Sequence, residues 1–384
     1  MFNVLIWDHT GDSPKWLERY IDKNAVKVIK TITPTELIPE VLLQSDSWDW
    51  LLIFERGMRK DLDTTLKTLK LPLEKVVYAL DGNSWAQNPK AVYTLLSESS
   101  SGANRRWVAF KNCQAHNNFI ACTVNDCSYV ATAKDDVIMR NMFLWRNNWA
   151  SSSMKRFHEL SQKYYNIDGG GEGIFLELGA NIGTTGIYFL KNLAPDLNLL
   201  AFEPDTENFK LLRINTILND LEDRATLVNC GLGDKADELI LYRGLTNPGG
   251  NSILKPGANR PTETIKVIAL DSYFAENKIP AAQIKYIWID TEGFEAQVIV
   301  GMKNLLKENP APIFMECNLG AWDNSGLFED MLALLAENYS HFILFPLKGK
   351  EELYPLETLR TLERAKNVLG QIGDIFLIRK GAID

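Results

Sequence analysis

The sequence predicts an α/β protein in which a mostly parallel, seven-stranded Rossmann-like sheet follows a smaller α/β domain. From Ile174 onward, apolar strand-like runs alternate with segments of helical periodicity. Residues 1 to about 90 show the same alternation with shorter runs. In the longer part the first apolar run ends in a glycine-containing turn, at the sheet edge where open α/β folds place their ligands.

Residues 1–100 are expected to form a domain of their own. Its strands are predicted from short runs rich in β-branched or aromatic residues: Phe2–Trp7, Val26–Ile32, Trp50–Phe54 and Lys75–Leu80. Leu62, Leu66 and Leu69 have helical spacing between two of them. The first turn, residues 8–12, lacks the glycine-rich loop of a nucleotide site. We therefore expect a docking or acceptor-selecting module, or a purely structural appendage.

Residues 101–172 are expected to join the two domains through a β-hairpin and a helical lid. Residues 97–104 have linker composition. Strands are predicted over residues 106–112 and 118–131, and a helix is predicted over residues 137–165. Trp145 and Trp149 lie on one face of that helix and are expected in the core. The run Gly169–Gly173 is a linker, a hinge for the lid, or both.

Residues 173–384 are expected to form the second domain. The predicted strands end at Gly179, Glu203, Asn229, Asp290 and Glu316. Helices are predicted over residues 206–218, 294–306 and 327–339. An insertion over residues 237–270 contains two strand-like runs, 239–242 and 264–270. Residues 341–346 and 374–379 are predicted to form an antiparallel hairpin at the edge of the sheet.

A nucleoside site is predicted where the first two strands of the second domain end. Gly179 and Gly183 allow the backbone to approach a ligand closely, and a helix follows at once. The second apolar run delivers the Glu203 carboxylate, which can accept both hydroxyls of a ribose. A dinucleotide would require G-x-G-x-x-G, but Asn181 occupies the position of the second glycine. The loop therefore suits a ligand without phosphates.

These residues resemble the first motif of class I S-adenosylmethionine (SAM) methyltransferases, and more narrowly the FkbM family. The resemblance runs over roughly residues 136–318 and is specific, because six segments match: 177–183, 202–209, 228–234, 247–252, 269–271 and 289–295. One departure is Glu177, where the family more often has Asp. Residues 48–80 look like the Rossmann-like accessory domain found beside such enzymes.

The resemblance implies a set of cofactor contacts. Glu177 is expected near the methionine or sulfonium end, and Glu203 at the ribose hydroxyls. The floor under the cofactor is expected from Gly179, Asn181 and Gly183, with Thr184 or Thr185 capping the following helix. Asn229, for which a turn role is the alternative, and Gly231 are expected at the adenine. Asp290 completes the cofactor set.

The acceptor side is predicted from acids at strand ends. Asp290 is the first candidate for a general base and Glu292 the second, because clustered acids raise each other's pKa. Glu295 is expected to be a solvated residue of a first helical turn, and Glu316 to join the site. Binding of Mg²⁺ by these acids stays an open alternative, and no metal ligand is assigned. Asn247, Asn251 and Ser252 are candidates for acceptor contact, and His158 is an outlying candidate for the base.

The leading interpretation is a SAM-dependent O-methyltransferase acting on a hydroxyl of a sugar, a glycan or a related natural product. An NAD-dependent oxidoreductase is disfavoured, because the glycine spacing differs and no Tyr-x-x-x-Lys pair occurs. Nitrogen methylation is disfavoured because no Asn/Asp-Pro-Pro-aromatic tetrapeptide follows the fourth strand. A non-catalytic scaffold that binds SAM or another nucleoside is a third reading.

Composition limits the partners. A net charge of −8 argues against nucleic acid and anionic membranes, which require a basic surface. No apolar run approaches the length of a membrane span, and the first residues suggest a strand rather than a signal peptide. Five cysteines without CxxC spacing suit a reducing, cytoplasmic location and no zinc site. A small-molecule or glycan acceptor is the expected partner, and a homo-oligomer stays open.

Overall fold

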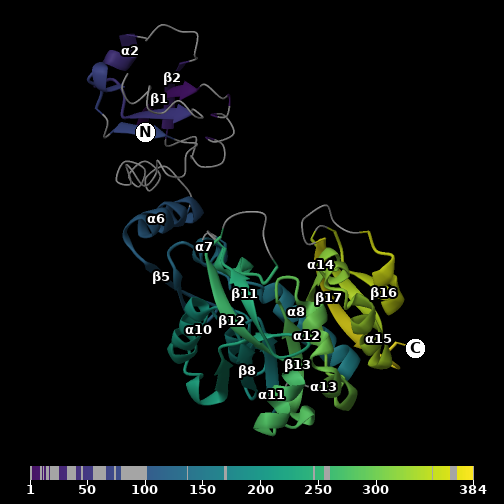
Figure 1. Ribbon diagram of the computed structural model, residues 1–384. Coiled ribbons are helices and arrows are strands. Elements are labelled where there is room, and N and C mark those ends of the chain that lie inside the picture. The colour runs from purple at the N-terminus through teal and green to yellow at the C-terminus, as the bar shows by residue number, and fades with distance from the viewer. Residues whose placement is uncertain are drawn as a thin grey trace. The chain divides into compact units, whose positions relative to one another are not determined.

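The computed structural model separates into two compact units, residues 1–120 with 143–145, and residues 121–142 with 146–384. The residues that the structure describes are 2–8, 11, 13, 17, 26–32, 40–44, 46–54, 66–72, 75–78, 102–135, 137–167, 171–244, 247–254, 260–347, 349–363 and 370–383. Each unit is described by itself below (Figure 1).

The first unit contains a parallel sheet with strand order β2-β1-β3-β4. Its strands confirm the prediction: β1 Phe2–Asp8, β2 Val26–Ile32, β3 Trp50–Phe54 and β4 Val76–Tyr78. A short helix, α2, covers Glu40–Leu43. Leu66 is buried in the core of this sheet with Trp48 and Leu51. The prediction for Leu62 lies outside the described residues.

Helix α6, Gly102–His116, replaces the strand predicted over residues 106–112. That prediction was wrong because it gave weight to Trp107, Val108 and Phe110, whereas the segment is also rich in the good helix formers Ala, Arg, Lys and Gln. Phe110 is buried and its ring lies 5.6 Å from that of Phe143.

The segment before the large sheet forms a hairpin and two helices. The single strand predicted over residues 118–131 is instead two strands, β5 Phe119–Val124 and β6 Cys127–Thr132, which pair with each other, so the predicted pairing with residues 106–112 was wrong. The single helix predicted over 137–165 is instead α7, Ile138–Trp145, and α8, Ser151–Tyr165. It is interrupted because Arg146 and Ala150 have positive φ angles of 55° and 56°. Trp145 is 64% exposed, so its predicted place in the core was wrong.

The large sheet of the second unit has the order β16-β15-β17-β14-β13-β7-β8-β9. Five neighbouring strands, β14, β13, β7, β8 and β9, are parallel, and β17, β15 and β16 add antiparallel partners. Among the described residues this sheet has eight strands where seven were predicted, since the short edge strand β16 escaped the hydrophobic pattern. The bounds are β7 Ile174–Leu178, β8 Asn198–Phe202, β9 Ala225–Val228, β13 Ile284–Ile289, β14 Ile313–Asn318, β15 Tyr339–Pro346, β16 Glu352–Pro355 and β17 Gln371–Arg379.

Helices connect and cover these strands. The predicted helix 206–218 is α10, Thr206–Leu218, and the last predicted helix is α15, Phe328–Asn338. Phe157 of α8 packs against aromatic rings of β13, β14 and β17, so α8 covers one face of the sheet. The other elements are α9 Gly186–Asn192, α11 Leu270–Asn277, α12 Glu295–Val300, α13 Lys303–Glu308, α14 Leu319–Ser325, and the 3₁₀ turns η2 Glu222–Arg224, η3 Pro248–Gly250, η4 Ala281–Gln283 and η5 Leu356–Arg360.

The helix predicted over 294–306 is divided into α12 and α13 at Gly301. A Cβ atom on Gly301 would lie 1.9 Å from the carbonyl oxygen of Gly233. The two backbones therefore approach more closely than any side chain permits. This contact fixes the chain after β10 against the end of α12.

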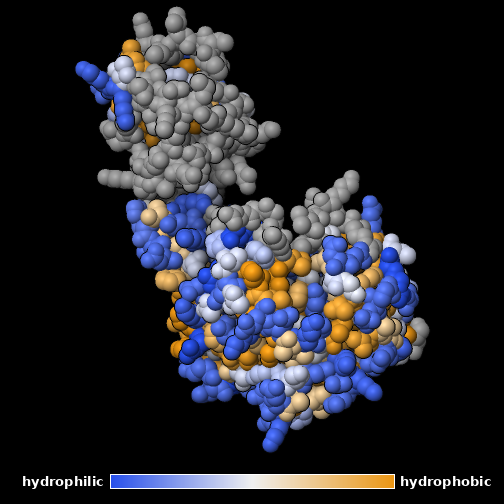
Figure 2. Space-filling model, in the orientation of Figure 1, coloured by the Kyte–Doolittle hydropathy of each residue, from blue (hydrophilic) through white to orange (hydrophobic). Residues whose placement is uncertain are grey.

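The predicted insertion forms a three-stranded sheet, β10-β12-β11. β10 is Gly231–Leu232, and β11, Asp237–Tyr242, pairs antiparallel with β12, Thr262–Ile268. Leu241, Ile265 and Val267 form its small core, whereas Ile240 on β11 is 50% exposed. Figure 2 shows hydrophobic residues on the visible face of this unit where Figure 1 draws β11 and β12.

Within the described part of the chain, none of the helices combines the length and the apolar character that a membrane crossing requires.

Candidate functional site

A crevice of the second unit opens at the carboxyl ends of β7, β8, β13 and β14. Loops after these strands line it on one side, and residues of the 247–253 segment line it on another. Val137, Ile138 and Trp149, from the segments around α7, complete the lining. This is the sheet edge at which the sequence predicts a ligand.

The turn after β7 is fixed by its backbone. Gly179 has a φ of +92°, and a Cβ atom there would lie 1.9 Å from the carbonyl oxygen of Asp290. The N–H groups of Gly179 and Ala180 donate to the carbonyl oxygen of Phe202 at 3.0 and 2.9 Å. Only glycine satisfies both the positive φ and the close approach, so Gly179 brings the ends of β7, β8 and β13 together.

Glu203 follows β8 and is only 5% exposed. Its Oε2 accepts the N–H of Asn181 at 2.7 Å, and its Oε1 accepts the N–H of Asp205 at 2.8 Å. Burial raises the pKa of this carboxyl to about 8, although the two N–H groups act in the opposite direction. Glu203 lines the crevice, so its remaining lone pairs are available to a ligand.

Glu177 on β7 is fully buried. Its Oε1 accepts the N–H of Gly186 at 3.0 Å, at the start of α9, and burial raises its pKa to about 8. The predicted capping of α9 by Thr185 was wrong, because the Thr185 side chain makes no capping hydrogen bond. Thr184 makes none either: its carbonyl oxygen accepts from Asn148 at 2.9 Å, and Glu177 takes the first N–H of the helix.

Three acids meet on the other side of the crevice. Asp290, Glu292 and Glu316 each offer a carboxylate oxygen, and these oxygens lie within 4.8 Å of one another. Burial and then the neighbouring acids raise the pKa of Asp290 and of Glu316 well above the ordinary range. Burial also raises the pKa of Glu292 to about 7. A raised pKa makes each of these carboxylates, when deprotonated, a stronger base toward a hydroxyl proton; oxygen ligands at this spacing also suit a hard divalent cation.

Glu295 holds the turn that carries Glu292. It is fully buried, and its Oε1 accepts the N–H groups of Thr291 and Gly293 at 3.1 Å. Its Oε2 accepts the indole N–H of Trp322 at 2.9 Å. The expectation of a solvated Glu295 was therefore wrong. Its bonds stabilise a turn in which Glu292 has a φ of 53°.

The segment 247–253, hereafter the rim loop, closes part of the crevice. The Asn247 side chain accepts the N–H of Gly249 at 3.1 Å, and that of Asn251 accepts the N–H of Gly244 at 2.8 Å. The Ser252 hydroxyl donates to the carbonyl oxygen of Glu292 at 2.9 Å. The loop is thereby tied to the acidic side of the crevice.

The structure brings most of the predicted site residues to one crevice. Those that line it are Gly179, Asn181, Thr184, Glu203, Gly231, Asn247, Asn251, Asp290, Glu292 and Glu316. Four others do not belong to the lining: Glu177, Gly183, Asn229 and Ser252. Asn229 donates to the carbonyl oxygens of Glu203 and Pro204 at 2.8 and 3.2 Å, which is the turn role considered as its alternative.

Several lining residues were not predicted from the sequence. They are mostly apolar: Val137, Ile138, Trp149, Cys230, Leu232, Leu241, Ile253 and Phe294. The lid was predicted as a helix, but the pattern gave no reason to separate Trp149 from the core. His158, the outlying candidate base, does not belong to the lining; its Nδ1 lies 3.0 Å from the Tyr286 hydroxyl, and burial lowers its pKa.

Comparison with known proteins shows similarity to methyltransferases. Residues 177–341 match the model of the methyltransferase FkbM domain. The chain is 27% identical to methyltransferase sdnD of Sordaria araneosa over 190 residues, which are 42% of this chain and 71% of that relative.

Solved structures with similarity to the chain include two methyltransferases. One is methyltransferase FkbM of Methylobacillus flagellatus, at 14% identity and a TM-score of 0.36, over 98% of this chain and 90% of the other. Another is the O-methyltransferase of Bacillus cereus in complex with S-adenosylhomocysteine (SAH), at 15% identity and a TM-score of 0.36, over 78% and 100% of the two chains.

The buried Glu177 gives a test by pH. Its folded-state pKa is raised from 4.5 to about 8, so the folded protein holds a proton that the unfolded chain releases between these values. The resulting stability is complete below pH 4.5 and is lost as the pH rises through 8. Glu177→Gln mimics the protonated acid. At pH 8.5 its free energy of unfolding, measured with urea, should exceed that of the parent by a few kcal/mol, whereas at pH 5 the two free energies should be nearly equal. The exposed Glu276→Gln is the control, and parallel pH profiles for parent and Glu177→Gln would contradict the assignment.

Proposed function

Because this chain contains an FkbM methyltransferase domain, we propose that it is a SAM-dependent O-methyltransferase whose acceptor is a hydroxyl of a sugar, a glycan or a related natural product. The observation that carries the proposal is the Glu203 carboxylate at the crevice, bonded to the N–H of Asn181 in a glycine turn. A buried acid beside a turn without phosphate-binding spacing fits the ribose of an adenosyl ligand.

The residues of the crevice fit SAM on a further point. The side-chain oxygen of Asn181 is buried without a hydrogen-bond partner among the described residues, in a side chain that belongs to the lining. Such an oxygen is costly unless a ligand donates to it, and the ammonium and hydroxyl groups of SAM are donors. When bound, SAM supplies a methyl group that a nucleophilic oxygen can take from the sulfonium sulfur, which leaves as the neutral thioether of SAH.

The remaining residues have supporting roles in this proposal. Glu177 lies beneath the turn at the proposed methionine or sulfonium end, where a bound cation would favour the loss of its proton. Gly179, Asn181 and Gly183 shape the floor, and Thr184 borders it. Gly231 flanks the adenine with Leu232, while Asn229 holds the Glu203 turn.

Asp290 is the proposed general base and Glu292 its alternate. The acceptor hydroxyl would give its proton to the carboxylate as its oxygen takes the methyl group, so the acid cluster ends with one more proton. Asn247, Asn251 and Glu316 are the proposed acceptor contacts, and Ser252, which lies outside the lining, supports them by tying the rim loop to Glu292. Mg²⁺ held by Asp290, Glu292 and Glu316 is a second way to orient the hydroxyl, which the 4.8 Å spacing favours.

We further propose a division of labour along the chain. Residues 1–100 would serve as the accessory domain for docking or acceptor selection, residues 101–172 as the linking hairpin and lid, and residues 173–384 as the methyltransferase domain. Trp149 supports the lid role because it lines the crevice. The hinge proposed at residues 169–173 lies partly outside the described residues.

Calorimetric titration with SAM, SAH and NAD⁺ tests the ligand class. We expect binding of the first two and no binding of the third. Glu203→Ala should weaken SAH binding by a few kcal/mol, because a charged acceptor of two ribose hydrogen bonds is lost. If Glu203→Ala binds as tightly as the parent, the ribose assignment is wrong; NAD⁺ binding alone would favour an oxidoreductase.

The rate of methyl transfer tests the proposed general base. With a panel of free sugars and glycosides as acceptors, the rate of SAH formation should rise as the pH increases through about 7, the pKa of Glu292, because the acids must lose protons to act. Asp290→Asn should lower kcat by about 100-fold and leave the SAH affinity nearly unchanged. A kcat equal to that of the parent at every pH would exclude Asp290 as the base. Tight SAH binding without turnover on any acceptor would favour the scaffold alternative.

A further inference from the structure

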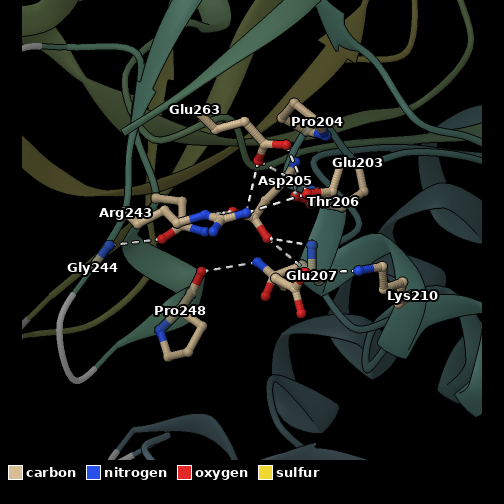
Figure 3. A network of polar contacts seen from close by, with 12 residues as sticks. Glu203, Pro204, Asp205, Thr206, Glu207, Lys210, Arg243, Gly244, Pro248 and Glu263 are labelled. Carbon is tan, nitrogen blue, oxygen red and sulfur yellow. Dashed lines mark hydrogen bonds and ion pairs between the residues drawn. The ribbon is translucent and has the colours of Figure 1, made fainter. Parts of the chain in front are cut away.

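We propose that Arg243 is a positioning residue that aligns the Glu203 turn with the rim loop, and so sets how well the crevice recognises a ribose. This inference rests on the proposed function, because it concerns the same ligand. Arg243 follows β11 and does not belong to the crevice lining. Its effect would pass through the contacts drawn in Figure 3.

Arg243 joins two acids from different elements. Its Nε donates to Asp205 Oδ2 at 2.5 Å, and its Nη2 donates to Glu263 Oε2 at 2.8 Å. Asp205 follows β8, whereas Glu263 lies on β12. The guanidinium therefore holds the small sheet against the turn that leaves β8.

Thr206 closes the same network. Its hydroxyl donates to Glu263 Oε1 at 2.6 Å, and its hydroxyl oxygen lies 3.3 Å from Arg243 Nη2. The two elements are thus joined by a shared cation and by a hydrogen bond from a hydroxyl to a carboxylate. Such fork-shaped pairing fixes orientation as well as distance.

Asp205 transmits this geometry to the ligand side. Its backbone N–H donates to Glu203 Oε1 at 2.8 Å, so a shift of Asp205 moves the partner that holds the ribose acid. Its Oδ1 accepts the N–H groups of Glu207 and Asn208 at 2.9 Å each, which starts α10. One residue therefore links Arg243, the helix start and Glu203.

The rim loop is attached to the same junction. The Asn208 side chain donates to the carbonyl oxygen of Pro248 at 3.0 Å, and the N–H of Gly244 donates to Asn251. A Cβ atom on Gly249 would lie 3.1 Å from Asn181 Nδ2 and 2.8 Å from Ile138 Cδ1. The loop, the glycine turn and the lid are therefore in contact.

Charge makes Arg243 specific for this task. The Asp205 side chain is 2% exposed, whereas those of Arg243 and Glu263 are 29% and 21% exposed. Without Arg243, two carboxylates would face each other near the protein interior and would move apart. Lysine has a single ammonium, so it can replace one of the two contacts well but not both.

The test compares SAH with its 2′-deoxy analogue by calorimetry. The parent should prefer SAH, because Glu203 accepts the 2′-hydroxyl. Arg243→Met should weaken SAH binding about tenfold and leave the analogue nearly unchanged, so that the preference shrinks. The SAH affinity of Arg243→Lys should fall between that of the parent and that of Arg243→Met. A general loss of stability would lower the affinities for both ligands equally and leave the ratio of the two affinities unchanged.

Arg156→Met is the matched control, because Arg156 also forms an ion pair, with Glu351 at 2.9 Å, and does not belong to the crevice lining. It should leave both affinities unchanged. If Arg243→Met does not fold, Glu263→Gln, which weakens one arm of the network, should lower the preference about threefold.

The outcomes separate this inference from the proposed function. An unchanged preference in folded Arg243→Met, or in Glu263→Gln if Arg243→Met does not fold, overturns the role of Arg243 alone, and the ligand assignment stands. A parent that binds neither compound overturns the proposed function and this inference with it.

Discussion

The structure of the crevice depends on one buried carboxylate that receives N–H groups from two loops. Glu203 accepts from Asn181, in the glycine turn after β7, and from Asp205, at the start of α10. These bonds hold the ends of two neighbouring strands in a single arrangement. Because the acid is almost fully buried and its pKa is raised, each N–H group that stabilises its charged form matters for the site.

Acidic side chains are concentrated around the crevice. Glu203 lies on one side, and Asp290, Glu292 and Glu316 lie on the other. Such a site disfavours phosphates and other anions and favours a cation or a neutral donor of hydrogen bonds. The proposed sulfonium ligand has that character. Their raised pKa values make these carboxylates, once deprotonated, stronger bases toward the proton of a reacting hydroxyl.

The sequence predicted the elements whose hydrophobic pattern is strong and local. The bounds of α10 follow from periodicity, and Gly179 and Glu203 were recognised by their spacing along two strands. Other features depend on tertiary contacts. The division of the helix at Gly301 arises from a backbone of a distant segment, and the burial of Glu295 depends on Trp322. The Arg243 network joins residues from three elements, which no local pattern indicates.

A crystal structure of the protein with SAH tests the central claim most directly. The account predicts ribose oxygens within hydrogen-bond distance of the Glu203 carboxylate, with the sulfur facing Asp290 across the crevice. A nucleoside bound elsewhere while the crevice stays empty, or a ribose in the crevice that is turned away from Glu203, would contradict it.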